Sequence, residues 1–443
     1  MFSMASISRA PVSAATEESA GVDPFNDVRI RRADRSQVSW GPIDLDSQLP
    51  PDHEVRAIVA LIERLDLSAL YAQIVARGTR AGAPAIDPKI LLALWVYATS
   101  EGETSAREIE RLTTLHTAYR WVCGGVSVSY HTLADFRSQQ NEVLDDLVTQ
   151  VLALLMKQNL IELKRVAQDG TRVRASAGAN SFRRQGSLEE MMLEARAHLD
   201  KLAQEAADPT LDKKRSAARK RAAEERIARL EAAARELPEI AATKKKSGAK
   251  DKEPRVSTTD PDARVMKMGD GGFRPAVNVQ FATTTDKARV IVGVSVTNRG
   301  SDMNEAAPML EQIERRTGQM PDQTLVDGGY VGHATIDATT QKGVVILGPV
   351  PKPREGDTRD RYAPRDTDSQ PVAEWRQRMS TEEAKEIYKL RAATAETVNA
   401  DAKQHRGLDH MPVRGLEKAL GCALLFALTY DLLRALALGV LTT

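Results

Sequence analysis

The sequence predicts a mixed α/β protein. An all-helical N-terminal region precedes a sheet, and a helical insertion interrupts the sheet after its first strand. Apolar residues recur at helical spacing up to about residue 160. Alternating and β-branched runs begin only after that point. With 443 residues, of which 42% are hydrophobic, the chain is long enough for two or three globular domains.

The N-terminal region is predicted to begin with a mobile tail, residues 1–45, and to continue as a helical domain, residues 46–160. The pair Asp87-Pro88 marks a helix start, because Asp caps free N–H groups and Pro fits the first helical position. Residues 89–99 are apolar nearly all round, which predicts burial. Further helices are predicted at residues 52–70, 105–115 and 130–159.

Helical segments are predicted on both sides of the chain break at Gly124-Gly125. Ser105, with Glu108 three residues later, has the pattern of a capping box and opens the first segment. Residues 105–112 and 131–138 could form a helix-turn-helix that reads DNA. An ordinary layer of packed helices explains the same pattern, and the sequence leaves both interpretations open.

Strands and helices alternate in the second part of the chain. Residues 276–283 and 289–297 are strand-like runs joined by a short polar turn, which predicts a hairpin. The full predicted order is strand 165–169, a helical insertion, strands 276–283 and 289–297, helix 304–316, strand 323–327, helix 333–342, strand 344–347, a loop over 349–371, and helices 381–404 and 414–438.

The predicted insertion, residues 187–256, is a long helical segment that Pro209 divides into two antiparallel helices. Residues 212–255 contain 15 Lys and Arg against 8 Asp and Glu, a local net charge of +7 in a chain of net charge +1. Such a segment either contacts phosphates or is a solvated charged helix, and the sequence does not decide between them. Aromatic residues are only 4% of the chain, so binding through rows of stacked bases is not expected.

Three acidic residues are predicted to form a metal site. Asp169 and Asp327 each end a short apolar run and precede glycine, which places them at strand ends with room for ions and a DNA backbone. Glu396 lies on a predicted helix that could cross over those strand ends. Mg²⁺ prefers oxygen ligands. Two such ions about 3.5–4 Å apart can activate the attacking oxygen and neutralise the leaving oxygen of a phosphodiester.

The helix that carries Glu396 has a patterned polar face. At about 100° per residue, Glu396, Asn399 and Lys403 fall on a narrow arc, and Tyr388 and Arg391 lie one to two turns before it. These four neighbours of Glu396 are predicted to contact DNA, with Arg391 and Lys403 holding phosphate oxygens. The alternative is an ion pair of Glu396 with Lys403 or another basic neighbour, which would contribute only about 0.2–0.5 kcal/mol.

These residues resemble the pattern of bacterial insertion-sequence transposases of the DDE class, in the group with a Tyr-Arg-Glu-Lys signature. Two residues separate Tyr388 from Arg391 and six separate Glu396 from Lys403, as in the family pattern. Four residues separate Arg391 from Glu396, where the commonest form has three. The predicted element order is also that of the ribonuclease H-like fold, which retroviral integrases share. The resemblance covers residues 50–438 except the basic insertion.

The resemblance implies that Asp169, Asp327 and Glu396 bind Mg²⁺, with Mn²⁺ as a substitute. It implies cleavage at the ends of a mobile element and attack of the freed 3′-hydroxyl on target DNA. The partners would be terminal inverted repeats, target DNA and a second copy of the chain, and the catalytic domain would comprise residues 161–186 and 257–443. A nuclease of the same fold that cuts without joining, or a non-catalytic DNA-binding descendant, remains an alternative.

The compartment is predicted from cysteines and hydropathy. Cys123 and Cys422 are far apart and suggest neither a disulfide framework nor a zinc site, which fits a reducing cytoplasm. The resemblance implies that this is a bacterial cytoplasm, with the protein at the nucleoid. The N-terminus has no continuous apolar core typical of a signal peptide. Residues 419–440 are the most apolar stretch but include Asp431 and Arg434, which predicts a buried core helix and no membrane span.

Overall fold

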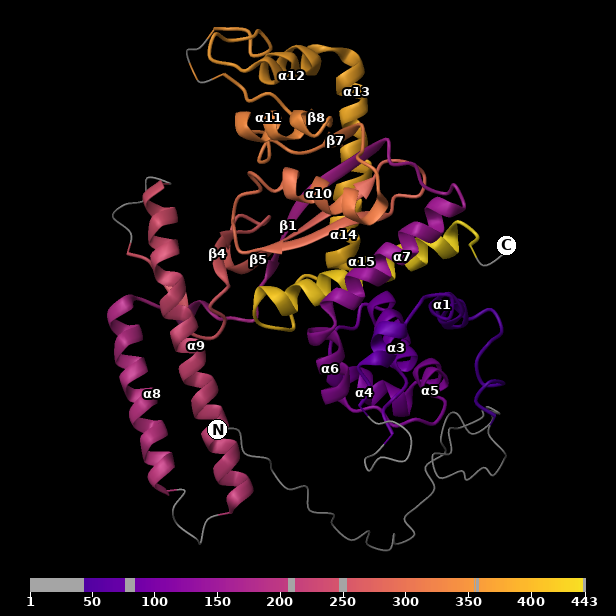
Figure 1. The fold of residues 1–443 in the computed structure, drawn as a ribbon, viewed down its shortest axis with the longest axis vertical. Helices are drawn as coiled ribbons and strands as arrows, with labels where there is room; N and C mark the ends of the chain where they lie inside the picture. Colours follow the sequence, from indigo (N-terminus) through magenta and orange to yellow (C-terminus); the bar gives the residue numbers. More distant parts are fainter. Residues whose placement is uncertain are drawn as a thin grey trace, which may run out of the picture. The chain divides into compact units, whose positions relative to one another are not determined.

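A six-stranded mixed sheet forms the centre of the fold (Figure 1). This computed structural model describes residues 44–75, 84–205, 212–246, 253–353, 355 and 358–440. Residues Leu45–Thr443 group as one unit. The predicted mobile tail therefore lies almost wholly outside the described residues. The predicted domain boundaries near residues 160, 187 and 256 stay predictions.

The strands lie in the order β4–β5–β1–β7–β8, and β6 pairs with the same edge of β5 as β4. β5 is antiparallel to β1 and β6, whereas β7 is parallel to β1 and β8 is parallel to β7. The β7–β8 connection passes through a helix, as a parallel pair requires. The strands are β1 (Arg165–Arg174), β4 (Arg264–Lys267), β5 (Phe273–Thr284), β6 (Ile291–Thr297), β7 (Gln323–Leu325) and β8 (Val345–Leu347).

The N-terminal helices and the sheet share one hydrophobic core, with Leu92, Leu144, Phe281 and Phe426 among its buried members. The C-terminal helix α15 (Leu416–Ala437) joins the two parts, because it packs against α3, α6, α7 and β6. The N-terminal helices are α1 (Glu54–Ile62), α2 (Ser68–Ala72), α3 (Pro88–Ser100), α4 (Ala106–Leu115), α5 (Thr117–Cys123), α6 (Tyr130–Gln139) and α7 (Asn141–Lys157). By length and hydropathy α15 could span a membrane, but 72% of its most apolar window is buried in the protein, as predicted for a core helix.

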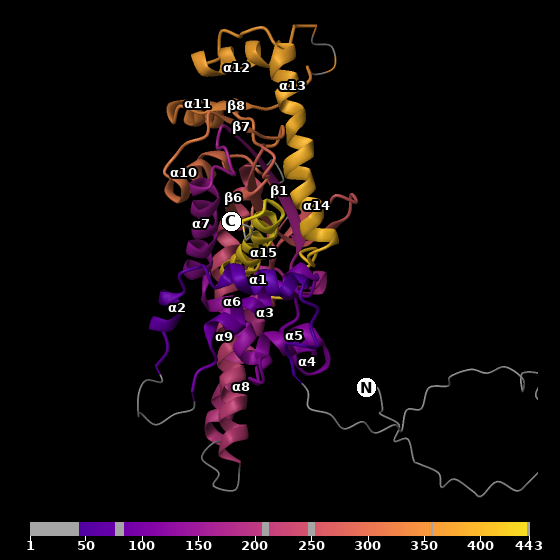
Figure 2. The same ribbon diagram turned by 90° about the vertical axis from the view of Figure 1, so that its right-hand side faces the viewer.

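A second buried cluster surrounds β7 and β8 and includes Leu325, Ile346, Trp375 and Ala395. The helices of this region lie before, between and after β7 and β8 in the chain, and Figure 2 shows the long α13–α14 segment running beside β1. These elements are α10 (Ala306–Thr317), α11 (His333–Gln341), α12 (Gln370–Ser380), α13 (Glu382–Arg391), a π-helical turn (Ala392–Glu396) and α14 (Thr397–Gln404).

The insertion is a helical hairpin. Helices α8 (Gln185–Glu205) and α9 (Lys213–Lys246) lie side by side (Figures 1 and 2) and bury a small core of their own, which includes Leu188, Ala195 and Leu230. Pro209, the predicted break between them, lies outside the described residues. A short 3-10 turn (Ala179–Ser181) and the pair β2 (Phe182–Arg183) and β3 (Val256–Ser257) stand at the base of the hairpin.

Several predicted elements are confirmed. Asp87 caps α3 by accepting a hydrogen bond from the Lys89 N–H at 2.9 Å, and most of that helix is buried. Gly124 ends α5 in the left-handed conformation, at φ 54°. The predicted hairpin forms between β5 and β6. The capping box at Ser105 forms only in part, because the Glu108 side chain pairs with Arg111 instead of reaching back to the cap.

Three predictions were wrong. The strand at residue 165 does not end at Asp169 but continues to Arg174, because β5 pairs with β1 along its full length. Residues 52–70 form two helices, α1 and α2. Within the predicted 349–371 loop and the stretch after it, helix α12 was missed, although Val372, Trp375 and Met379 repeat at helical spacing on its buried side.

Candidate active site

Asp169 and Asp327 lie at the same level on neighbouring strands. β1 and β7 pair in parallel with Ala167 opposite Leu325, so the residues two places further along, Asp169 and Asp327, extend from the same part of the sheet. Asp169 lies in the middle of β1, and Asp327 follows the end of β7 by two residues. The prediction that both stand at strand ends is therefore wrong for Asp169 and right, within two residues, for Asp327.

Arg391 joins the sheet to the helix that carries Glu396. Its guanidinium lies 3.2 Å from Asp169 Oδ2 and 2.8 Å from Glu396 Oε1. The Asn399 Nδ2 group donates a second hydrogen bond to Asp169 Oδ2, at 3.1 Å. Four residues that are up to 230 positions apart in the sequence are thus in direct contact.

A π-helical turn sets the position of Glu396. Five residues of α-helix turn about 500°, which would place Arg391 and Glu396 about 140° apart. Residues Ala392–Glu396 form a π turn instead. Its i→i+5 bonding accommodates one extra residue per turn and brings these two side chains to one side. The π turn therefore accommodates the fourth residue between Arg391 and Glu396, where the commonest family spacing has three.

Burial raises the pKa of Asp169 above its ordinary value; Arg391 opposes the shift and the negative charge of Asp327 adds to it. For Arg391, burial acts to lower the pKa, but Asp169, Tyr388, Asp327 and Glu396 together outweigh this and the pKa is raised. Glu396 is 55% exposed, against 15% for Asp169. The site therefore combines one buried acid and one solvated acid on a shared cation.

Tyr388 and Lys403 lie at either end of this helix segment and are both half-buried. Burial raises the pKa of Tyr388, with Arg391 opposing and Asp327, Asp169 and Glu396 adding to the shift, so the phenol keeps its proton near all three acids. Burial and the charge of Arg172 lower the pKa of Lys403, while Asp169 opposes the shift. Glu396 pairs with Arg391 and not with Lys403, so the ion pair with another basic neighbour, which the sequence left as the alternative, is present in the structure.

The donor set fits a hard divalent cation by its chemistry. Asp169, Asp327 and Glu396 offer carboxylate oxygens. The Asn399 Oδ1 atom beside them is buried without a hydrogen-bond partner. Within the described ranges, however, no group of three His, Cys, Asp or Glu side chains is assembled as a metal site. Arg391 stands between Asp169 and Glu396 and supplies the positive charge there.

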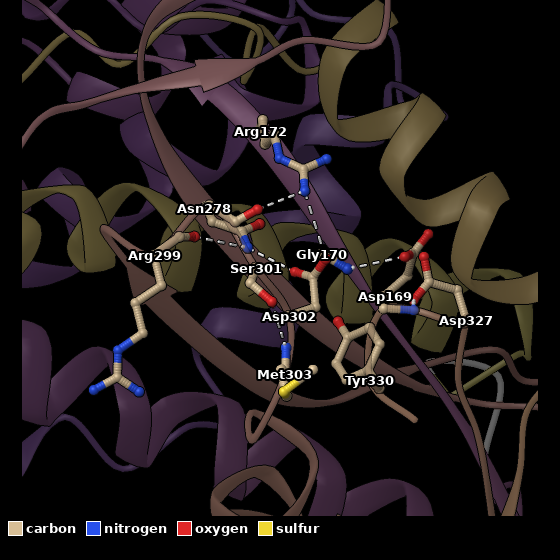
Figure 3. A network of polar contacts seen from close by, with 12 residues as sticks. Asp169, Gly170, Arg172, Asn278, Arg299, Ser301, Asp302, Met303, Asp327 and Tyr330 are labelled. Atoms are coloured by element: carbon tan, nitrogen blue, oxygen red, sulfur yellow. Dashed lines mark hydrogen bonds and ion pairs between the residues drawn. The ribbon is translucent and has the colours of Figure 1, made fainter. Parts of the chain in front are cut away.

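Sequence reasoning missed a fourth carboxylate, Asp302, which precedes α10. Figure 3 shows it beside Gly170, between Asn278 and the turn that carries Asp327 and Tyr330. The signal was available: Asn278 and Gln280 are polar residues two apart in the apolar stretch 276–282 of a buried strand. Such spacing indicates a polar network on one face of the strand.

Two family models match the chain. Residues 43–139 match a transposase domain (DUF772), and residues 245–432 match a transposase DDE domain. The second match contains Asp327 and Glu396, whereas Asp169 lies between the two matches. No curated protein and no solved structure matches the chain.

The fold and the site define a mixed α/β protein with acidic residues gathered on its sheet, and the two matches make it a DNA transposase. The chain belongs to the DDE transposases of insertion sequences.

Proposed function

We propose that the protein cleaves the ends of an insertion sequence and joins the freed 3′-hydroxyl to target DNA, with Asp169, Asp327 and Glu396 as metal ligands in a ribonuclease H-like catalytic domain. The observation that carries this proposal is Arg391, which contacts Asp169 on the sheet and Glu396 on the helix at once. The strand order, with an antiparallel β6–β5–β1 set followed by parallel β7 and β8, supports the fold assignment.

Mg²⁺, or Mn²⁺ in its place, would activate the attacking oxygen and neutralise the leaving oxygen of the phosphodiester. Asn399 fixes one oxygen of Asp169 through its amide. Arg391 and Lys403 are the cations placed to hold DNA phosphates, and Tyr388 offers a hydroxyl donor beside the acids. This assigns the Tyr-Arg-Glu-Lys signature to Tyr388, Arg391, Glu396 and Lys403.

The partners belong to the same proposal. The protein would act in the cytoplasm, at the nucleoid, on terminal inverted repeats and target DNA, and as a homodimer because two element ends must be joined. The two segments predicted to read DNA lie in the N-terminal helical region: residues 105–112 begin at the cap of α4, and residues 131–138 lie in α6. The α8–α9 hairpin is the proposed basic arm, and the solvated-helix alternative for it stays open.

The test is a strand-transfer assay with Mg²⁺, a pre-nicked element end and plasmid DNA. Glu396→Gln should abolish cleavage and joining while leaving affinity for the element end unchanged. Glu386→Gln, on the exposed face of α13, is the matched control and should keep full activity. Cutting by the wild type without any joined product would establish the nuclease alternative. Binding without cutting would establish the non-catalytic one.

A further inference from the structure

The side chain of Asp302 is nearly buried, and each of its two carboxylate oxygens has a polar partner. Its side chain is 9% exposed. Oδ1 accepts hydrogen bonds from Asn278 Nδ2 and Gln280 Nε2, both at 2.6 Å. Oδ2 faces the Arg172 guanidinium at 3.7 Å. Two amide donors and one cation therefore surround this carboxylate, as a buried polar group requires.

The same carboxylate packs closely on Gly170 and lies near Gly329, the glycines beside the two predicted metal ligands. A Cβ at Gly170, which follows Asp169, would overlap Asp302 Oδ1. A Cβ at Gly329 would lie 3.0 Å from Asp327 Oδ1 and 3.6 Å from Asp302 Oδ2. Neither glycine has a positive φ, so close approach of side chains explains these positions better than backbone freedom does.

A hydrogen-bonded network continues from Asp302 to the residues adjoining those ligands. Gln280 Oε1 accepts from the Tyr330 hydroxyl, which belongs to the turn that starts at Asp327. It also accepts from Gln168 Nε2 at 3.3 Å, next to Asp169 in β1. Gln168, Gln280 and Tyr330 are all at most 1% exposed. Buried networks of this kind fix backbone positions, because no water can replace a lost partner.

We propose that Asp302 is a positioning residue for the proposed metal site: it holds the β1 segment at Gly170 and the turn at Gly329 at a fixed separation, and thereby sets the distance between the Asp169 and Asp327 carboxylates. This rests on the proposed function, because those two acids are taken as the ligands. Asp302 itself is assigned no contact with metal or DNA.

Two variants separate positioning from direct ligation. Asp302→Ala removes the acceptor of both amides, and we expect about 10- to 100-fold weaker Mn²⁺ binding by calorimetry on the full chain without DNA. Asp302→Asn keeps one carbonyl oxygen as that acceptor, so it should bind Mn²⁺ within about threefold of wild type. Affinity for an element-end duplex should not change in either variant, because no DNA contact is lost.

A pair of glycines provides an independent test with a matched control. Gly329→Ala places a methyl group 3.0 Å from Asp327 Oδ1, closer than ordinary contact, and fills the remaining space toward Asp302 Oδ2 at 3.6 Å, so it should shift the turn and weaken Mn²⁺ binding. Gly328→Ala lies one residue away in the same turn, where a Cβ meets only Pro349 at an ordinary 3.5 Å. It should bind Mn²⁺ as the wild type does. This pair keeps the proposal testable if Asp302→Ala fails to fold.

Equal Mn²⁺ affinity in wild type, Asp302→Ala and Gly329→Ala overturns the positioning role. Loss in Asp302→Asn as large as in Asp302→Ala also overturns it, because Asp302 would then be a ligand itself. If the wild type binds no Mn²⁺ and cuts no DNA, the proposed function fails. If the wild type binds Mn²⁺ and cuts DNA, and the variants bind Mn²⁺ as tightly as the wild type does, only the positioning role is overturned.

A different feature carries a second proposal: a basic cavity of about 370 Å³ between the β7–α11 turn and α12. Arg376, 5% exposed, is fixed in its wall by Asp368 at 2.7 Å and by the Arg361 carbonyl at 3.1 Å. Among the described lining residues there are several basic side chains and no acid. The basic ones are Lys352, Arg359, Arg365 and Arg376, with His333 beside them.

We infer that this cavity binds a phosphodiester of the DNA strand held at the acids. Val331 lines the cavity and belongs to the turn that begins with Asp327, four residues earlier. Four residues span at most about 14 Å, so one strand can reach both places. The exposed cations Lys352 and Arg365 match a phosphate in charge, whereas the charge of Arg376 is compensated by Asp368 and serves to fix the wall.

The test is the salt dependence of binding to an element-end duplex. Lys352→Ala with Arg365→Ala should lower affinity about tenfold and reduce the slope of log K against log salt by about 1 to 2. Mn²⁺ binding should not change. Arg274→Ala, an exposed Arg paired with Asp270, is the matched control and should leave both quantities unaltered. An unchanged slope in the double variant overturns the inference, whereas the acids' role is judged by Glu396→Gln.

Discussion

Asp169 and Glu396 share one arginine but are held in opposite ways. Asp169 sits inside a ten-residue strand that pairs on both sides, and its side chain also accepts from Asn399 and from the Gly170 N–H. Glu396 stands at the end of a π turn, is more than half exposed, and has one ion pair, to Arg391. The sheet therefore offers a fixed oxygen and the helix an adjustable one.

This difference indicates which of the two acids can move when a metal ion binds. π turns are rare in helices and are frequently found at functional sites. A solvated Glu moves at little cost, whereas Asp169 is tied to the ladder and to the polar network beneath it. Assembly of the three acids around a cation would therefore proceed by displacement of Arg391 and movement of Glu396 toward the sheet.

The largest effect is expected for Arg391→Gln without metal. Asp169 would lose its cation while remaining buried, and we expect the free energy of unfolding to fall by about 3 kcal/mol, at the lower end for a broken buried pair because both side chains keep some exposure. Urea unfolding with and without Mg²⁺ measures this, and Mg²⁺ should restore part of the loss.

Lys389→Gln is the control for Arg391→Gln. Lys389 lies on the same helix and pairs with Glu386 on the exposed surface, where such pairs contribute little. Equal stability of the two variants would mean that Arg391 does not hold the buried acid, and the contrast between a fixed and an adjustable acid would then lose its basis.

A smaller effect is expected from deleting Ala393 in the π turn. The deletion restores the commoner spacing of three residues between Arg391 and Glu396, and α13 and α14 can keep their positions because an α turn replaces a π turn. We expect strand-transfer activity within about tenfold of wild type, and the melting temperature to be retained.

Deleting Ala400, in the regular α14, is the comparison. It rotates everything after it by about 100°, including Lys403, and should abolish activity. If both deletions were equally harmful, the π turn would be an integral part of the site and not an absorbed extra residue.

The sequence predicted the secondary structure best where local chemistry decides it. Asp87-Pro88 starts a helix and Gly124 ends one without help from the rest of the chain. The sequence also identified Arg391 and Asn399 as site residues, and in the structure both side chains contact Asp169. Their roles in catalysis stay predictions, as do those of Tyr388 and Lys403.

The remaining features depend on distant parts of the chain. The course of β1 through Asp169 and Gly170 is fixed by pairing to β5, more than 100 residues away, and the Asp-Gly pair taken alone reads as a turn. Asp302 could not be found from its own neighbourhood, because its partners Asn278 and Gln280 are on another strand. In the sequence, the only sign of the π turn is the unusual spacing between Arg391 and Glu396.

The smallest effect concerns Asp431, a carboxylate that is buried like Asp169 but has no predicted role. Its Oδ1 accepts from the Ile291 N–H at 2.8 Å, and its Oδ2 has no partner. Burial raises its pKa well above the ordinary value, against the opposing effects of the Ile291 hydrogen bond and of Arg316 and Arg434. The folded state therefore holds this proton more tightly than the unfolded state does, and ionisation destabilises the fold as pH rises from about 4 through the folded pKa.

Asp431→Asn does not titrate, so it should be more stable than wild type by about 1 kcal/mol at pH 8 and show no such gain near pH 4. Urea unfolding at both pH values measures the difference, with Asp135→Asn on the exposed face of α6 as the control. Asp169→Asn should not show the same gain at pH 8, because it also weakens the pairing with Arg391. If the two buried acids gave the same gain, burial alone would govern both, and the cation at Asp169 would contribute nothing to the fold.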